Sequence, residues 1–122
     1  MKKFLRSFHY ACEGVYYEFT HNLNLQVHFV IALLVMLISL LLNIKGFEMG
    51  ILGIMILLVI AAEMVNCALE EMVNLITTEH RKEAKQAKDV AAGMVLMVAI
   101  GSVIIAVLIF VPHIFSLLHI KH

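Results

Sequence analysis

Three long apolar segments, at about residues 27–44, 47–77 and 90–118, constrain this chain more than any other feature. The first is apolar on every face of a helix, which only a helix surrounded by lipid or by other protein tolerates. A helix of about 20 residues, rising about 1.5 Å per residue, crosses the roughly 30 Å of a bilayer core. Hydrophobic residues are 62% of the 122 and charged ones 15%, which excludes an ordinary soluble domain. We therefore predict one all-α membrane domain, residues 1–122, with three transmembrane helices.

Residues 3–20 show an amphipathic pattern ahead of the first apolar segment. Apolar side chains recur at the i, i+4, i+7 and i+11 spacings of a helix, and charged or polar residues fill the other positions. The apolar set is Phe4, Leu5, Phe8, Ala11, Cys12, Val15 and Phe19. We predict a surface helix that lies in the membrane interface or packs against other protein, two readings that are compatible. The polar run from His21 to Asn24 predicts a bend after it.

Basic residues are distributed unequally around the three predicted spans. Positive charge is retained on the cytoplasmic side of a membrane, so the side with more lysine and arginine faces the cytoplasm. One side carries Lys2, Lys3, Arg6, Arg81, Lys82, Lys85 and Lys88, and the other carries Lys45 and Lys121. The N-terminus and the loop between the second and third spans are therefore predicted to be cytoplasmic. A net charge of +0, with no basic patch interleaved with aromatic residues, predicts no binding of nucleic acid.

Polar residues form a stripe near the end of the second span. Glu63, Asn66, Glu70 and Asn74 fall within one narrow face of a helix. Counting about 1.5 Å per residue from Phe47 puts Glu63 about 24 Å along the helix, inside the hydrocarbon or close to its edge. An acid at that depth is costly unless it is paired or used, so function is the first hypothesis. The alternative is a glutamate that reaches the interface or hydrogen-bonds between helices.

Charged residues stand at the cytoplasmic start of the third span. Lys85, Lys88 and Asp89 precede the apolar run directly. The lysines are explained equally well as basic membrane anchors, but that explanation leaves Asp89 unaccounted for. Two acids on one helix and a basic and acidic pair on the next, meeting at the water boundary, have the chemistry to bind a divalent cation and a polyphosphate.

Two sequence motifs, which follow one another along the chain, resemble those of a known protein family. They are Glu63-Met-Val-Asn66-Cys-Ala-Leu-Glu70-Glu-Met-Val-Asn74 and Ala87-Lys88-Asp89-Val-Ala-Ala-Gly93. They resemble Glu-x-x-Asn-[Thr/Ser]-Ala-Ile-Glu-x-x-Val-Asp and Ala-Lys-Asp-x-Ala-Ala-Gly of the prokaryotic diacylglycerol kinase and undecaprenol kinase family. The segment Arg6-Ser7-Phe8-x-x-Ala11-x-x-Gly14 and the sequence Asn24-Leu25-x-x-His28 also resemble the start of that family.

The resemblance implies a small homotrimeric lipid kinase in the bacterial inner membrane, with its active site on the cytoplasmic side and shared between protomers. It implies ATP and Mg²⁺ as co-substrate and cofactor, and undecaprenol or diacylglycerol as the lipid alcohol. Its N-terminal segment and the ending Ile109-Phe110-Val111-Pro112 are more similar to the undecaprenol branch. Carried over, Glu63 is the general base and Glu70 a magnesium ligand. The implied nucleotide and substrate contacts are Arg6, Asn66, Lys88 and Asp89.

Three positions depart from the family pattern. Asn22 stands where many members have a second metal-binding acid, for which Glu18, one turn earlier, is the candidate substitute. Asn74 replaces the final acid of the first motif, and Cys67 replaces a small hydroxyl residue. We interpret Cys67 as a packing thiol. Two further readings stay open: an oligomer whose acids line a cation pathway, and an inactive relative with a structural role.

Overall fold

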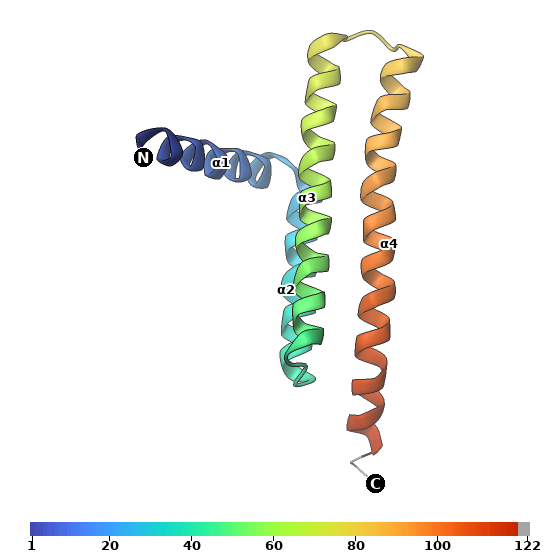
Figure 1. Ribbon diagram of the computed structural model, residues 1–122. Helices are drawn as coiled ribbons and strands as arrows, with labels where there is room; N and C mark the ends of the chain where they lie inside the picture. The colour runs from blue at the N-terminus through green and yellow to red at the C-terminus, as the bar shows by residue number, and fades with distance from the viewer. Residues whose placement is uncertain (120–122) are drawn as a thin grey trace.

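The computed structural model describes residues 1–119 of the chain (Figure 1). Within them four α-helices follow one another and there is no strand. Their bounds are α1 Lys2–His21, α2 Leu23–Leu41, α3 Phe47–Ile76 and α4 Lys82–His119. α2 and α4 pack against α3, and α1 projects sideways from the bundle. The all-α prediction is therefore confirmed.

A single residue, Asn22, joins α1 to α2 and sets the angle between them. Its extended backbone ends α1, and its Oδ1 accepts hydrogen bonds from the N–H groups of Asn24 and Leu25, at 2.9 and 3.3 Å. Asparagine is among the best residues for capping a helix start in this way. Because of this cap, α2 begins at Leu23. The apolar segment from which the first span was predicted begins several residues later, at about residue 27. Across the bend, Phe29 packs edge-on against Phe19, with ring centroids 5.1 Å apart.

Three of the helices, α2, α3 and α4, are long and apolar enough to cross a membrane. Many of their large hydrophobic side chains are exposed: Val30, Leu57 and Val103 are exposed by 58%, 67% and 63%. Exposed to water, each such side chain would cost about 25 cal/mol per Å² of apolar surface, whereas lipid solvates it. The arrangement is therefore that of a membrane protein with three spanning helices, as the apolar segments predicted.

α3 and α4 form a long antiparallel hairpin that extends beyond the level of α1 (Figure 1). α3 ends at Ile76, the next residue Thr77 has an extended backbone, and α4 begins at Lys82. The charged segment before the third span is thus helical, continuous with the apolar part of α4. This end of the hairpin is where the polar stripe of α3 reaches water.

At the opposite end of the bundle, α2 and α3 are joined by a short loop. Asn43 and Gly46 adopt left-handed backbone conformations, with φ of 58° and 65°, which asparagine and glycine accept more readily than other residues do. Beside this loop, Ile44, Leu52 and Ile109 form a buried apolar cluster that joins the loop to α3 and α4. The helices are thus held together by apolar packing at this end, which leaves the other end for polar side chains.

One ion pair also joins α3 to α4 at this end. His113 Nε2 lies 3.3 Å from Glu48 Oε2, and its Nδ1 lies 2.9 Å from the carbonyl oxygen of Ile109. Because α4 contains Pro112, which interrupts its backbone hydrogen bonding, this pair ties the last part of α4 to α3. We expect His113→Ala to lower the thermal midpoint in detergent by roughly 2–5 °C, since a half-exposed pair contributes up to about 1 kcal/mol.

The chain offers a matched control for that prediction. His9 and Glu13 form a second such pair, at 3.2 Å, but within α1 and with both side chains well exposed. His9→Ala removes the same type of side chain without disconnecting two helices, so its midpoint should change by less. Equal shifts in the two variants would show that the His113 pair does not join the helices.

Candidate active site

The polar stripe runs along one face of α3 from the protein interior to water. Because α3 is an unbroken helix, its members at i, i+3, i+7 and i+11 lie on one side. Glu63 and Asn66 are only 3% and 5% exposed, whereas Glu70 and Asn74 are exposed. The stripe therefore places one acid in the interior and another at the surface of the same helix face.

Glu63 is a buried carboxylate with little compensation. Its Oε1 accepts a hydrogen bond from Sγ of Cys67, one turn later on the same helix, at 3.9 Å. A thiol is a weak donor, and burying an acid without strong partners costs several kcal/mol. Among the described residues Glu63 makes no hydrogen bond to another helix, so it does not serve as a structural link between helices. Its position instead suits an acid that is used.

Of the two polar side-chain atoms of Asn66, the nitrogen forms a hydrogen bond and the oxygen does not. Its Nδ2 donates to Oε1 of Glu70 at 3.4 Å. Its Oδ1 is fully enclosed and has no hydrogen-bond partner in the described part of the chain. Buried polar atoms are nearly always hydrogen-bonded in proteins, so this enclosed oxygen is an exception within the stripe.

Beside the stripe is a hollow of about 390 Å³ between α1, the start of α2 and α3, which we term the α1–α3 hollow. The predicted metal ligands Glu18 and Glu70 both line it. The sequence had not singled out Glu71, which also lines it. Within residues 1–119 no group of three or more His, Cys, Asp or Glu side chains is close enough together to enclose a metal ion. Mg²⁺ at a nucleotide needs only one or two carboxylates, with phosphate and water completing its shell, so this donor set fits it.

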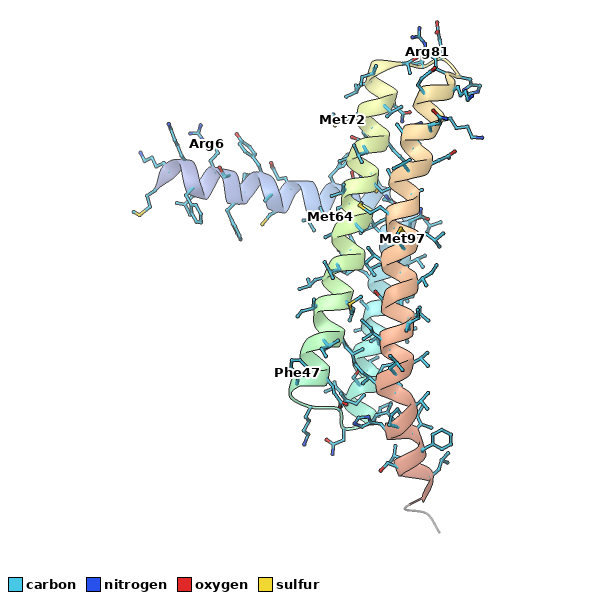
Figure 2. All side chains as sticks on the ribbon, turned by 45° about the vertical axis from the view of Figure 1, so that its right-hand side comes forward. Arg6, Phe47, Met64, Met72, Arg81 and Met97 are labelled. Atoms are coloured by element: carbon cyan, nitrogen blue, oxygen red, sulfur yellow. The ribbon has the colours of Figure 1, made fainter. Side chains whose placement is uncertain are left out.

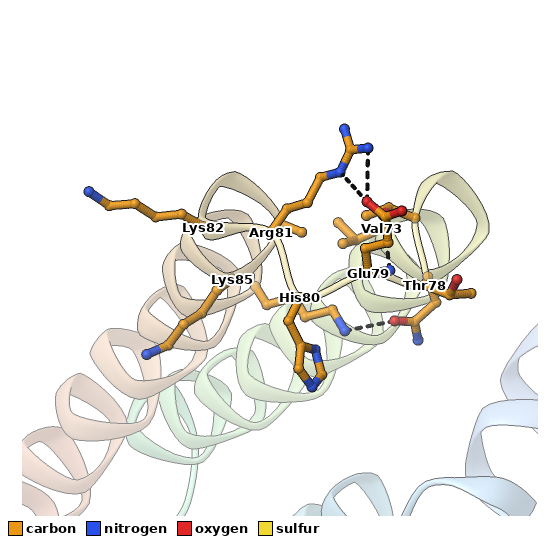
Figure 3. A pocket seen from close by; sticks show the side chains of 11 residues that line it. Val73, Thr78, Glu79, His80, Arg81, Lys82 and Lys85 are labelled. Atoms are coloured by element: carbon orange, nitrogen blue, oxygen red, sulfur yellow. Dashed lines mark hydrogen bonds and ion pairs between the residues drawn. The ribbon is translucent and has the colours of Figure 1, made fainter.

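A second hollow, of about 790 Å³, lies at the α3–α4 hairpin and we term it the hairpin hollow (Figure 3). Lys88 and Asn74 line it, and Nζ of Lys88 donates to Oδ1 of Asn74 at 2.7 Å. Nε and Nη2 of Arg81 both donate to Oε2 of Glu79, at 3.1 and 3.0 Å. The remaining cationic side chains of its lining are Lys82 and Lys85, which extend from α4 away from Glu79. The hairpin hollow is thus a basic chamber, suited to anions.

Asn74 lines both hollows, so it connects the acidic stripe with the basic chamber. The structure therefore brings Glu18 and Glu70 to one side of this junction and Lys88 to the other. Glu63 and Asn66 are buried further along the same face of α3 and line neither hollow. Two residues that were predicted to contact the substrates line neither hollow. Asp89 is exposed and lines neither hollow, and Arg6 is exposed near the free end of α1 (Figure 2).

The contact that sequence reasoning missed lies between Asn22 and Cys67. Nδ2 of Asn22 donates to Sγ of Cys67, across 45 positions of sequence. Cys67 is 6% exposed and is therefore packed, as predicted, but it packs against the site itself. Its place four residues after Glu63 was the available signal, because that spacing puts two side chains on the same helix face.

Comparisons with known proteins show which family this chain is similar to. The profile of the family described as prokaryotic diacylglycerol kinase matches residues 9–110. A protein named undecaprenol kinase, from Bacillus subtilis, is 36% identical over 112 residues, which are 92% of this chain and 91% of that protein. A protein named diacylglycerol kinase, from Synechocystis sp., is 36% identical over 115 residues, covering 93% of this chain and 66% of that protein. The family match includes the whole stripe and Lys88, whereas Arg6 precedes it.

Proposed function

This chain belongs to the prokaryotic diacylglycerol kinase family and is a lipid kinase, and from that premise we propose that it transfers the γ-phosphoryl group of ATP to undecaprenol. The observation that carries the proposal is the pairing of a buried and an exposed acid on one face of α3. A lipid alcohol and a water-soluble phosphate donor meet only where the membrane ends. Glu63 and Glu70 stand on the two sides of such a boundary.

The site faces the cytoplasm of a bacterial cell in this proposal, in the inner membrane. Most basic residues that flank the spans lie at the end of the bundle with α1 and the hairpin, which favours a cytoplasmic location for that end. ATP is available on the same side. The amphipathic α1, none of whose residues is buried by the rest of the chain, then rests in the inner interface of the bilayer.

Glu63 acts as the general base. The lipid hydroxyl donates its proton to the Glu63 carboxylate as its oxygen attacks the γ-phosphorus, the bond from that phosphorus to the β–γ bridging oxygen breaks, and ADP leaves. Asn66, three residues after Glu63 on the same face of α3, helps to position the hydroxyl group. Positioning of this kind is the larger part of catalysis in phosphoryl transfer.

Glu70 and Glu18 hold the magnesium ion that accompanies ATP, since both line the α1–α3 hollow. When bound, the ion neutralises negative charge on the phosphate oxygens. Glu70 also accepts the hydrogen bond of Asn66, so the carboxylate that holds the metal is connected to the side chain that holds the lipid. This connection fixes the distance between the two substrates.

Lys88 contacts the phosphates from the hairpin hollow, where it is already directed at the stripe through Asn74. We further propose that the protein is a homotrimer. Asp89 and Arg6 stand outside the hollows of a single chain, and their roles as nucleotide contacts then belong to the boundary between protomers. The abundance of exposed apolar side chains on the spanning helices supplies surface for such packing.

The acceptor preference can be tested directly by competition. Beneath α1 lies a hollow of about 630 Å³ lined by apolar residues, among them Phe8, Val15, Phe19 and Phe29. Such walls accommodate a hydrocarbon chain but offer little to the ester carbonyls of diacylglycerol, and buried polar groups without partners are disfavoured. With both lipids present at equal mole fraction, we expect kcat/KM for undecaprenol to exceed that for diacylglycerol at least about tenfold.

The competition is measured as label transferred from γ-labelled ATP to each lipid after extraction and separation. Equal labelling, or a preference for diacylglycerol, would contradict the acceptor that we propose. Labelling of neither lipid, in protein that binds nucleotide, would contradict the kinase reaction itself and favour the cation-pathway reading of the acids.

A further inference from the structure

The bend between α1 and α2 contacts the buried acid of the site through Asn22. Both polar atoms of the Asn22 side chain form hydrogen bonds. Its Oδ1 accepts from two backbone N–H groups at the start of α2, which fixes the orientation of the amide, because only the oxygen can accept. Its Nδ2 consequently faces Cys67 and donates to Sγ.

Cys67 passes this contact on to Glu63. A thiol has one proton, and Sγ donates it to Oε1 of Glu63 at 3.9 Å while it accepts from Asn22. The hydrogen bonds therefore run in one direction, from the amide to the thiol to the carboxylate. None of the hydrogen bonds among the described residues involves the other oxygen of Glu63, Oε2, so that oxygen is left for substrate.

Two of the three residues that depart from the family pattern, Asn22 and Cys67, are thus in contact with each other. A carboxylate at position 22 could not donate to sulfur; it would accept the thiol proton and compete with Glu63 for it. The Asn22 amide instead presents its Nδ2 donor to the thiol. The amide and the thiol are compatible as a pair, which the sequence alone did not reveal.

We propose that Asn22 and Cys67 are positioning residues that hold the Glu63 carboxylate for attack by the lipid hydroxyl. The inference rests on the proposed role of Glu63 as base. Since Glu63 has no other hydrogen-bond partner among the described side chains, loss of the thiol frees its side chain to rotate. A base held loosely spends less time within reach of the proton that it must accept, so kcat falls while nucleotide binding does not change.

The test begins with Cys67→Ala and Cys67→Ser. We expect Cys67→Ala to lower kcat about tenfold, the effect of a small misplacement of a catalytic group, with KM for MgATP within about twofold of wild type. Cys67→Ser keeps a donor at the same place and should recover at least about half of the wild-type kcat. Ser7→Ala, which removes an exposed hydroxyl group on α1 that lines none of the hollows, is the control and should have no effect.

Asn22 is tested separately from its role as a helix cap. Asn22→Ser keeps an oxygen that caps α2 but is too short to replace the amide donor to Cys67. We expect it to lower kcat about as much as Cys67→Ala does, with a thermal midpoint close to that of wild type. A normal kcat in Asn22→Ser, or a loss in Cys67→Ser equal to that in Cys67→Ala, would overturn the proposal.

The failure of this inference can be distinguished from failure of the proposed function. In a Glu63→Gln background, Cys67→Ala should lower the residual kcat by less than about twofold, because the effects of residues that act through one group are not additive. An additional tenfold loss would show a role that does not depend on Glu63. Full activity of Glu63→Gln alone would reject the base, whereas an inactive Glu63→Gln beside a fully active Cys67→Ala would reject only the positioning.

Discussion

Glu63→Gln should lower kcat by about 10²- to 10⁴-fold, which is the usual contribution of a general base. Glutamine has nearly the same shape and keeps an oxygen that can accept from the thiol of Cys67. The change therefore removes the ability to take a proton and little else. The affinity for MgATP should stay within about twofold, because the nucleotide contacts that we propose lie elsewhere on the stripe and in the hairpin hollow.

The measurement is kcat at saturating lipid, together with nucleotide binding by calorimetry in the same detergent. Glu83→Gln is the control, since it neutralises an exposed acid in the first turn of α4 that lines neither hollow. It should behave as wild type. A kcat of Glu63→Gln within about threefold of wild type would be incompatible with general base catalysis of the usual size by this residue.

Glu70→Gln should produce the second large effect, on the requirement for magnesium. Glutamine can still accept the hydrogen bond of Asn66, so only the negative charge is removed. Loss of one of two carboxylates that hold the ion should raise the Mg²⁺ concentration for half-maximal rate at least about tenfold. At fixed, subsaturating Mg²⁺ the rate should fall correspondingly, and added Mg²⁺ should restore part of it.

This prediction is checked by titrating Mg²⁺ at constant ATP and lipid. Glu13→Gln, which alters an exposed acid paired with His9 on α1, is the matched control. An unchanged Mg²⁺ profile in Glu70→Gln would show that the exposed acid of the stripe does not hold the ion. In that event Glu18 and Glu71, the other acids of the α1–α3 hollow, would be the residues to change next.

Much of the architecture follows from the sequence because lipid is a demanding solvent. A segment that is apolar on all sides can span a membrane only as a helix, whose backbone bonds are internal, and three such segments define the bundle. The stripe could also be predicted, since residues at i, i+3, i+7 and i+11 of any helix share a face. The helix ends were less accessible: α2 begins at Leu23 because Asn22 caps it, a local effect that apolar runs do not record.

The site was predictable in its parts and not in its assembly. Lys88 and Asp89 are adjacent in sequence, but one residue turns a side chain by about 100° around a helix, so only Lys88 is directed at the stripe. The contact from Asn22 to Cys67 depends on the angle between α1 and α3, which no periodicity encodes. For the same reason we could interpret Cys67 from the sequence only as a packing thiol, and its contact with Asn22 could not be predicted.

The central claim is that the acids of α3 direct phosphate from ATP onto a lipid hydroxyl at the membrane boundary. Its most direct test follows ADP and labelled lipid together in purified protein supplied with γ-labelled ATP, Mg²⁺ and undecaprenol. We expect equal amounts of ADP and lipid phosphate from the wild type, and neither from Glu63→Gln above a small residual rate. ADP formed without labelled lipid, or equal lipid labelling by both proteins, would contradict the claim.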